Sequence, residues 1–298
     1  MKKAKKIRLA FLTALFVCSL AACLTANVEN LEEFAPEWES FSEGVDYFSA
    51  VIANPHLQIW AFRVNIQKMQ KSGQKFVVSP LAKAGVISGT TVSDFAKQYG
   101  CSFALNANPF TPVSAKKGEE RDILGVVVSN GELLSSPNTE YDAFVVMNDG
   151  SASIVNQGKI KKSIDSETKK PKGVFFAVGG FYRVLENGKI AAEVAARADV
   201  RHPRSAIGTS SDGSTAYFVV VDGRRMGSVG VTETELAFLL QKLGAYDALN
   251  LDGGGSSALS VRFPAKDKLQ LVNKPVHNRI PGWERVVATC IGISASAE

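Results

Sequence analysis

Short apolar runs rich in valine, isoleucine and phenylalanine recur along the chain, and they limit most strongly what it can fold into. Glycine, asparagine and aspartate bound these runs, a pattern typical of β-strands. We expect strands over residues 57–66, 76–78, 101–105, 123–128, 143–147, 174–178, 216–221 and 286–293. Since 45% of the residues are hydrophobic and 21% are charged, such strands can bury a core, and a mainly disordered chain is excluded.

Two segments carry clear helix signals. Thr232 and Glu235 have the spacing of a capping box, leucines follow at helical spacing, and Gly244 ends the pattern. A second helix is predicted over residues 91–99, ended by Gly100. The expected fold class is α+β, a mixed β-sheet core with a few packed helices. In such folds, polar loops that follow strand ends usually carry the chemistry.

The first 22 residues have the properties of an export signal. Five basic residues precede an apolar run over residues 9–17, which is too short to span a membrane. Leu20-Ala21-Ala22-Cys23 resembles a bacterial lipobox, in which cleavage leaves Cys23 as a lipidated N-terminus. The alternative is an ordinary cleavage site beside a chance cysteine. We expect a chain that is exported and lipid-anchored to the bacterial cell envelope, with the membrane as a partner through this anchor.

The charge balance argues against nucleic acid as a partner. The chain has 34 basic and 29 acidic residues, a formal net charge of +5. Five of the basic residues lie within residues 1–22, so removal of the signal leaves 29 of each sign. A balanced chain lacks the basic field that polyanion binding requires. Any anion must therefore be held by a local site.

The remaining chain is interpreted as a tether followed by one domain. Residues 24–48 contain seven acidic and no basic residues, so we expect a lipidated N-terminus and acidic tether over 23–48 and a single domain over 49–298. Polar stretches at 114–122 and 159–172 are predicted to be surface loops.

Cysteines and histidines give no metal signature. Cys101 and Cys290 lie in apolar, strand-like contexts, where buried free thiols and a disulfide are both open. No C-x-x-C motif is present, and the three histidines are far apart in sequence. We therefore predict no cofactor and no zinc site, while calcium or magnesium bound by carboxylates stays open.

The strongest candidate for chemistry is the motif Asn250-Leu251-Asp252-Gly253-Gly254-Gly255-Ser256-Ser257. Three consecutive glycines cost folding entropy, yet they let the backbone approach a ligand closely. With two serine hydroxyls and one carboxylate, the motif suits an anion or sugar. It is neither a P-loop, since no Gly-Lys-Ser/Thr follows, nor a nucleophile elbow, since the second flanking glycine is absent. The structural alternative is a tight turn after a strand.

Two further segments hold charged candidates. Arg201 and Arg204 flank Pro203 ahead of an apolar segment, where guanidinium groups suit a phosphate. Asp222-Gly223-Arg224 follows an apolar strand, and a hairpin turn is its structural alternative.

Asn106 and Asn108 are candidates for hydrogen bonds to sugar hydroxyls. Their structural alternative is Asx-turn formation ahead of Pro109.

Together these segments resemble the phosphodiester glycosidase domain, typified by the lysosomal uncovering enzyme, which removes N-acetylglucosamine from a phosphodiester to expose mannose 6-phosphate. The resemblance spans residues 57–293 and is carried by residues 106–110, 201–208, 222–224, 235–237, 250–257, 273–275 and 284–285. The family often has Asn-x-Gly-aromatic where this chain has Asn106-Ala107-Asn108-Pro109-Phe110.

The resemblance implies an active site around the glycine motif. It implies Asp252 and Asp222 as catalytic residues, with Asp252 as nucleophile or as base towards water. The implied substrate-binding residues are Asn106, Asn108, Arg201, Arg204, Arg224, Gly253, Gly254, Gly255, Ser256, Ser257, Asn273 and Arg285. For Arg285, binding of phosphate and pairing with an acid are both open. Glu235 is left out because its capping role accounts for it.

We therefore expect a hydrolase of sugar-1-phosphodiesters, with substrates like N-acetylglucosamine-1-phosphodiesters in envelope or capsule glycans. A non-catalytic glycan-binding lipoprotein on the same fold is one alternative. A metal-dependent phosphodiesterase that cuts the P–O bond is another.

Overall fold

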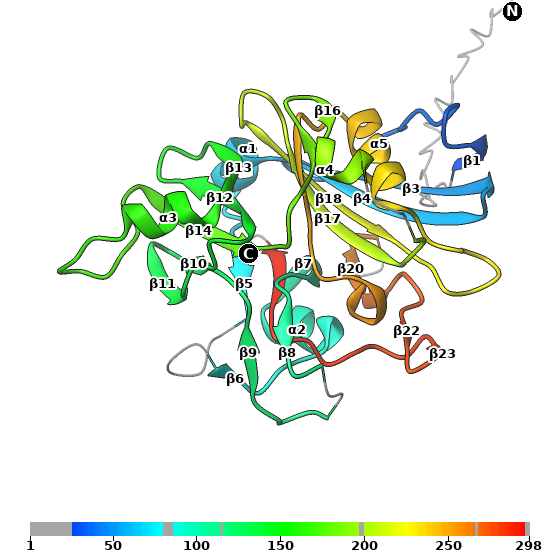
Figure 1. Cartoon of the computed structure of the whole chain (residues 1–298). Helices are drawn as coiled ribbons and strands as arrows, with labels where there is room; N and C mark the ends of the chain where they lie inside the picture. The colour runs from blue at the N-terminus through cyan, green and yellow to red at the C-terminus, as the bar shows by residue number, and fades with distance from the viewer. Residues whose placement is uncertain (1–25, 80–85, 114–115, 197–199, 266–267, 296–298) are drawn as a thin grey trace, which may run out of the picture.

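The computed structural model describes residues 26–79, 86–113, 116–196, 200–265 and 268–295. Strands are far more abundant than helices among these residues, and Figure 1 shows a large sheet at one side of the molecule with smaller sheets beside and below it. This is the α+β arrangement, a mixed sheet with a few helices, that the sequence predicts.

The largest sheet has nine strands in the order β1-β3-β4-β18-β17-β19-β15-β16, with β2 paired to β3. Its strands are β1 (Ala26–Asn30), β2 (Glu39–Ser42), β3 (Val45–Asn54), β4 (Leu57–Asn65), β15 (Arg183–Glu186), β16 (Lys189–Ile190), β17 (Arg204–Thr209), β18 (Thr215–Val221) and β19 (Asp247–Asn250). The pairing of β1 with β3 is parallel, whereas β17 pairs antiparallel with both of its neighbours. The sheet is therefore mixed.

Two five-stranded sheets pack beside the large one. The first has the order β21-β20-β7-β24-β5, and the second has the order β11-β10-β14-β12-β13. Their strands are β5 (Phe76–Val78), β7 (Cys101–Asn106), β10 (Val127–Ser129), β11 (Glu132–Ser135), β12 (Asp142–Met147), β13 (Ala152–Asn156), β14 (Val174–Gly179), β20 (Leu259–Phe263), β21 (Lys268–Leu271) and β24 (Cys290–Ser294). Short strands form a three-stranded sheet and a hairpin: β6 (Val86–Ile87), β8 (Phe110–Thr111), β9 (Arg121–Ile123), β22 (Val276–His277) and β23 (Ile280–Pro281).

Both predicted helices are confirmed. Helix α5 (Glu233–Leu243) begins at a capping box, in which Thr232 Oγ1 accepts from the Glu235 amide at 3.0 Å and the Thr232 amide donates to the Glu235 carboxylate at 3.0 Å. It ends at Gly244, whose φ of 105° lies in the left-handed region. Helix α2 (Val92–Gln98) has Thr91 as its N-cap. The other helices are α1 (Ile66–Lys71), α3 (Gln157–Ser163), α4 (Ala192–Ala195) and the 3₁₀ turn η2 (Gly254–Ser256).

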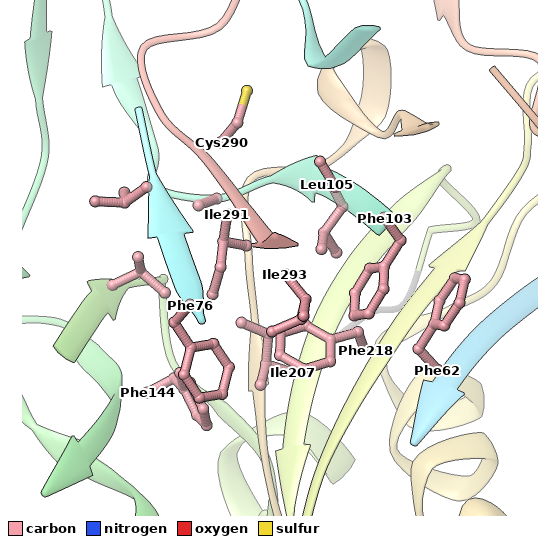
Figure 2. Close-up of a cluster of buried hydrophobic side chains, with 14 of the residues drawn as sticks. Phe62, Phe76, Phe103, Leu105, Phe144, Ile207, Phe218, Cys290, Ile291 and Ile293 are labelled. Atoms are coloured by element: carbon pink, nitrogen blue, oxygen red, sulfur yellow. The ribbon is translucent and has the colours of Figure 1, made fainter. Parts of the chain in front are cut away.

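The large sheet is buried on both faces, because side chains alternate along its strands. On β18, Phe218 and Val220 face the core that the smaller sheets share, whereas Val219 and Val221 face a second core under α5. Figure 2 shows the shared core, in which Phe62 of β4 and Phe103 of β7 are stacked with ring centroids 3.9 Å apart. This core fixes the small sheets against the large one.

The expected acidic tether is a structural part of the domain instead. Residues 39–42 form β2, and β3 spans residue 49, where the domain was expected to begin. Phe34, Phe41 and Phe48 are buried, so the aromatic residues anchor this segment while its acidic residues remain at the surface. The described part of the domain therefore starts at Ala26.

Two local predictions also differ from the structure. The lysine-rich stretch 159–172, expected as a loop, begins inside α3, because Asn156 caps that helix and Ile160 buries one face. The run 123–128, expected as one strand, divides between β9 and β10, because Gly125 has a φ of 115° that breaks the extended backbone.

The glycine motif lies where the chain crosses from the large sheet to a smaller one. It follows β19, in the interior of the large sheet, and leads into β20, which pairs with β7. Asn106 ends β7, and Arg285 precedes β24, the other neighbour of β7. Residues distant in sequence are therefore brought to this crossing.

Candidate functional site

The glycine loop, residues 252–257, is held by backbone hydrogen bonds on two sides. The Asp252 amide donates to the Ala107 carbonyl at 3.1 Å, and the Gly254 amide donates to the Pro203 carbonyl at 2.8 Å. Asn106 Nδ2 donates to the Asp252 carbonyl at 2.5 Å. The loop is thus fixed between the end of β7 and the segment that enters β17.

The glycines of this loop make room for two guanidinium groups. A Cβ at Gly254 would lie 2.8 Å from Nη2 of Arg224, and a Cβ at Gly255 would lie 2.6 Å from Nη2 of Arg285. Gly254 also has a φ of 60°, a conformation that glycine adopts without strain. Any other residue at either position would displace an arginine. The loop therefore carries two positive charges on its surface.

Asp252 places one carboxylate beside these charges. Its Oδ1 accepts from the Gly253 amide at 3.0 Å, whereas Oδ2 is buried and has no hydrogen-bond partner among the described residues. Burial raises the pKa of Asp252, and the Ser256 hydroxyl and the nearby Arg285 charge offset this only in part. A buried carboxylate oxygen without a partner is costly, so this atom is a candidate for contact with a ligand.

Arg285 is oriented by two further contacts. Its Nη1 donates to Ser256 Oγ at 3.2 Å, and its Nε donates to Nδ1 of His277 at 3.2 Å. Because Nδ1 accepts, the neutral His277 ring carries its proton on Nε2, which is buried without a partner in the described part of the chain. Burial lowers the pKa of His277, and the Arg285 charge adds to this effect. Trp283 packs edge-on against the ring, with centroids 5.5 Å apart.

His202 lies on the Arg224 side of the loop. Burial lowers its pKa, and the positive charges of Arg224 and Arg204 lower it further. Its Nδ1 is buried, with no partner in the residues that the structure describes. Sequence reasoning missed both His202 and His277 as site residues, since their wide separation was used only to dismiss a metal site. For His202, its place inside the 201–208 segment was an available signal.

Asp222, expected to be catalytic, is a structural cross-link instead. Its side chain is 1% exposed and pairs with Arg225 at the start of the loop that follows β18. It also accepts from Asn273 Nδ2 at 2.9 Å and from the Lys274 amide at 3.0 Å. Both carboxylate oxygens are occupied, so neither is available to a substrate. The structural alternative, a hairpin turn at Asp222-Gly223, is not observed, because Asp222 makes these contacts instead.

Arg204 points away from the glycine loop. It opens β17, and alternation puts its side chain on the α5 face, opposite that of Ser205, whose hydroxyl donates to Asn106 Oδ1 at 2.7 Å. The Arg204 guanidinium donates to the Val231 carbonyl at 3.1 Å and pairs with Glu233 at 3.1 Å. This geometry does not support the expected phosphate contact of Arg204, because its donors are used by Val231 and Glu233.

Arg201 is also engaged elsewhere. Its guanidinium holds both carboxylate oxygens of Glu235 and donates to the Gly230 carbonyl at 3.0 Å. Glu235 thus caps α5 and fixes Arg201 at once. The expected substrate contact of Arg201 is not supported by this geometry.

The expected amide and hydroxyl ligands are buried and mostly hold the scaffold. Asn108 Nδ2 donates to the Val126 carbonyl at 3.1 Å, and Asn273 Nδ2 donates to the Ser257 carbonyl at 3.0 Å. Asn106 is fully buried between β7 and the loop. These asparagines tie strand ends together, which differs both from Asx turns and from direct sugar contacts. Ser257 Oγ is buried and has no partner among described residues.

Cys101 and Cys290 are both free and buried, which excludes the disulfide alternative. Burial raises the pKa of Cys101 to about 12 and also raises that of Cys290. In the register of neighbouring strands β7 and β24, Cys101 lies opposite Ser294 at one end and Cys290 lies opposite Asn106 at the other. The two cysteines are therefore at opposite ends of this strand pair. Cys23 and residues 1–22 lie outside the described residues.

Other features of the described ranges are separate from this loop. No three His, Cys, Asp or Glu side chains there converge as metal ligands. None of the helices there has the length and hydrophobicity to span a membrane. Cavities of about 480 and 270 Å³ are lined by residues such as Phe238 and Phe95, respectively, and neither lining includes a glycine-loop residue.

Comparisons with known proteins point to one family. A family model described as phosphodiester glycosidase matches residues 99–294. The SPbeta prophage-derived uncharacterized protein YomE of Bacillus subtilis (strain 168) is 30% identical over 218 residues, which make up 70% of this chain and 30% of that protein. The chain thus spans 30% of the length of this curated relative.

Solved structures share the fold. The catalytic domain of zebrafish N-acetylglucosamine-1-phosphodiester alpha-N-acetylglucosaminidase superposes with a TM-score of 0.61 at 20% identity, covering 88% of this chain and 89% of that one. A hypothetical protein from Synechocystis superposes with a TM-score of 0.55 at 15% identity, covering 87% of this chain and 64% of that one. At these identities the likeness concerns the fold.

Proposed function

The chain belongs to the phosphodiester glycosidase family, and on that premise we propose that it hydrolyses sugar-1-phosphodiesters at the glycine loop. The observation that carries the proposal is the juxtaposition at this loop. Two guanidinium groups, of Arg224 and Arg285, lie on the backbone beside a carboxylate oxygen of Asp252 that has no partner in the described structure. An anion with an adjoining electrophilic carbon is the substrate type that suits this combination.

The charges suit a phosphodiester in particular. The phosphate group carries one negative charge before the reaction and gains a second as it leaves. Arg224 has no acidic partner among the described residues, and Arg285 contacts only neutral side chains directly in that part of the chain. Both guanidinium groups are therefore available to stabilise the growing charge, the role that fixed donors play in other active sites.

A single carboxylate is sufficient for this chemistry. An ordinary glycosidase needs a second carboxyl group to protonate a departing alkoxide. A phosphate monoester leaves more easily, since its second pKa is about 6. In the reaction, the bond between the anomeric carbon and the phosphate oxygen breaks, water supplies the new oxygen on that carbon, and its proton ends on phosphate or solvent. The structural role of Asp222 is consistent with this scheme.

Asp252 has two possible roles that differ in their products. As a nucleophile it forms a glycosyl ester, which water then hydrolyses with net retention of the anomeric configuration. As a base it activates water for one displacement with inversion. The configuration of the first-formed sugar, followed by NMR, distinguishes the two roles.

The proposed location is the bacterial cell envelope, with glycans of the envelope or capsule as substrates. This rests on the sequence of residues 1–23, with a lipobox-like segment before Cys23. Cys23→Ser is expected to move the chain from the membrane fraction to the soluble fraction. Mass spectrometry that finds an unmodified N-terminus downstream of Cys23 would overturn the anchor.

The activity is tested by incubating the purified domain with a panel of sugar-1-phosphodiesters and identifying the products. Free sugar together with a phosphate monoester is the expected result. Sugar 1-phosphate as product, abolished by a chelator, would identify a metal-dependent phosphodiesterase instead. Saturable glycan binding without turnover would identify a binding protein. A Val113→Ser variant, altered at an exposed residue outside the glycine loop, serves as a folding control.

A further inference from the structure

Most of the large hydrophobic residues that are exposed in the described structure lie within a few residues, in sequence, of side chains at the candidate site. Within the described residues there are seven: Val113, Val200, Met226, Val229, Tyr246, Ile280 and Trp283. Five of them lie on the three segments that bring His202, Arg224 and Arg285 to the glycine loop. Single exposed hydrophobic residues are ordinary, but their concentration beside a charged site is typical of a binding surface.

Met226 is exposed because an anchored turn presents it. The backbone groups of Arg225 and Ser228 bond to each other at 3.2 and 3.1 Å, and Ser228 Oγ donates to the Asp222 carbonyl at 2.7 Å. The ion pair of Asp222 with Arg225 fixes the same turn. Met226 lies at its tip with 94% of its surface exposed. The turn is therefore held by polar contacts, while its apolar tip contributes nothing to the core.

A rigid hairpin presents Ile280 and Trp283 on the side of Arg285. Asn278 and Arg279 have φ values of 47° and 63°, as a two-residue hairpin turn requires. The hairpin strand β22 packs against η2 of the glycine loop. Trp283 remains 45% exposed although one edge of its ring contacts His277. Its other surface is thus available beside the cationic loop.

We propose that Met226, Ile280 and Trp283 bind an apolar group esterified to the phosphate, so that the substrate is a sugar-1-phosphodiester with an aliphatic or lipid aglycone. This inference rests on the proposed function. In this arrangement Arg224 and Arg285 hold the phosphate. The ester substituent then extends over Met226, Ile280 and Trp283, which lie only a few residues from these arginines in the sequence. An apolar substituent removes these side chains from water, whereas a fully hydroxylated aglycone gains little from them.

The test compares alkyl esters of one sugar 1-phosphate, from methyl to octyl, all below their micelle concentrations. We expect kcat/KM to rise about tenfold or more from the methyl to the octyl ester, within the range that apolar contacts supply. Met226→Ser and Trp283→Ala are expected to reduce this octyl-to-methyl ratio towards one. Val113→Ser, altered at an exposed hydrophobic residue outside the three segments, is the matched control and should keep the ratio.

A binding measurement separates this inference from the activity itself. Calorimetry with dimethyl phosphate and methyl octyl phosphate, which lack a sugar, should show at least about tenfold tighter binding of the octyl compound. Equal affinity, or turnover that does not depend on chain length, overturns the apolar aglycone and leaves the hydrolase intact. Failure to turn over any ester, with the octyl preference in binding retained, contradicts the hydrolase but not the apolar surface. Phosphatidylglycerol vesicles bound through Met226 and Trp283, without any preference among soluble esters, would assign the surface to a membrane and overturn the proposal.

Discussion

The guanidinium group of Arg285 lies on the backbone of Gly255, where a Cβ would stand 2.6 Å from Nη2. Arg224 lies on Gly254 in the same way, at 2.8 Å. Gly254 and Gly255 are therefore explained by the two arginines that pack against them, since a side chain at either position would collide with a guanidinium group. This relationship places two positive charges at fixed positions next to Asp252.

Gly255→Ala is expected to reduce turnover by displacing Arg285. Gly255 does not have a positive φ, so alanine is compatible with the backbone, and the added methyl group acts mainly on the arginine. Loss of one charge-assisted contact should lower kcat/KM roughly ten- to hundredfold. The melting temperature should change little, because the displaced atom belongs to a flexible side chain.

A double-mutant cycle checks this cause. If the methyl group acts through Arg285, then Gly255→Ala combined with Arg285→Ala should be little worse than Arg285→Ala alone. Fully additive losses would show that Gly255 acts independently of the arginine.

Arg204→Ala should lower stability and keep turnover, whereas Arg224→Ala should lower turnover and keep stability. Arg204 pairs with Glu233 in the core, so its loss should lower the free energy of unfolding by about 2 kcal/mol while the folded fraction keeps its turnover. Arg224 is exposed and has no acidic partner in the described chain, so its loss should lower turnover and leave the melting temperature nearly unchanged. Urea unfolding and kcat/KM on the same preparations measure both effects. A stable Arg204→Ala variant without activity would return Arg204 to the site.

Asp252→Asn should remove activity without destabilising the fold. Burial raises the pKa of Asp252, so the protonated carboxyl favours the folded state below its ordinary value of 3.8. This contribution is lost as the pH rises through the raised pKa. At neutral pH the uncharged asparagine should therefore melt at an equal or higher temperature than the wild type. Turnover should fall by at least about a hundredfold.

The stability difference between Asp252→Asn and the wild type should grow from pH 4 to pH 7. Melting curves across this range measure it. A variant that melts well below the wild type at neutral pH would indicate that Asp252 is a structural turn residue.

Ser256→Ala should move the acid limb of the pH–rate profile to higher pH. The Ser256 hydroxyl lowers the pKa of Asp252, so its removal raises that pKa further, and the ionised form appears only at higher pH. Ser257→Ala is the matched control, since Ser257 Oγ has no partner among the described residues. An equal shift of the acid limb in both variants would show that this limb does not report the ionisation of Asp252.

Local patterns predicted the fold class and its clearest elements. The capping box at Thr232 and the apolar runs of β4, β12 and β18 are short-range signals, and the structure confirms them. The N-terminal strands were missed because acidic residues mask their aromatic anchors, such as Phe41 and Phe48, whose burial depends on contacts with the rest of the sheet.

The candidate site was predictable only in part. The glycine motif singled out the loop against which Arg224 and Arg285 lie in the structure. Arg204 was misplaced because the face of a strand residue depends on where the strand begins, which sequence spacing did not fix. The structural contacts of Asp222 were not predicted, because its partner Asn273 lies 51 residues away and no local pattern indicates that contact.

Hydrolysis in ¹⁸O-labelled water shows which bond breaks, and the proposed mechanism requires that it is the bond to the anomeric carbon. A sugar-1-phosphodiester that the domain turns over is incubated in labelled water, and both products are analysed by mass spectrometry. The scheme around Asp252, Arg224 and Arg285 predicts the label in the released sugar and none in the phosphate monoester. Label found in the phosphate would show cleavage of the P–O bond and contradict the account.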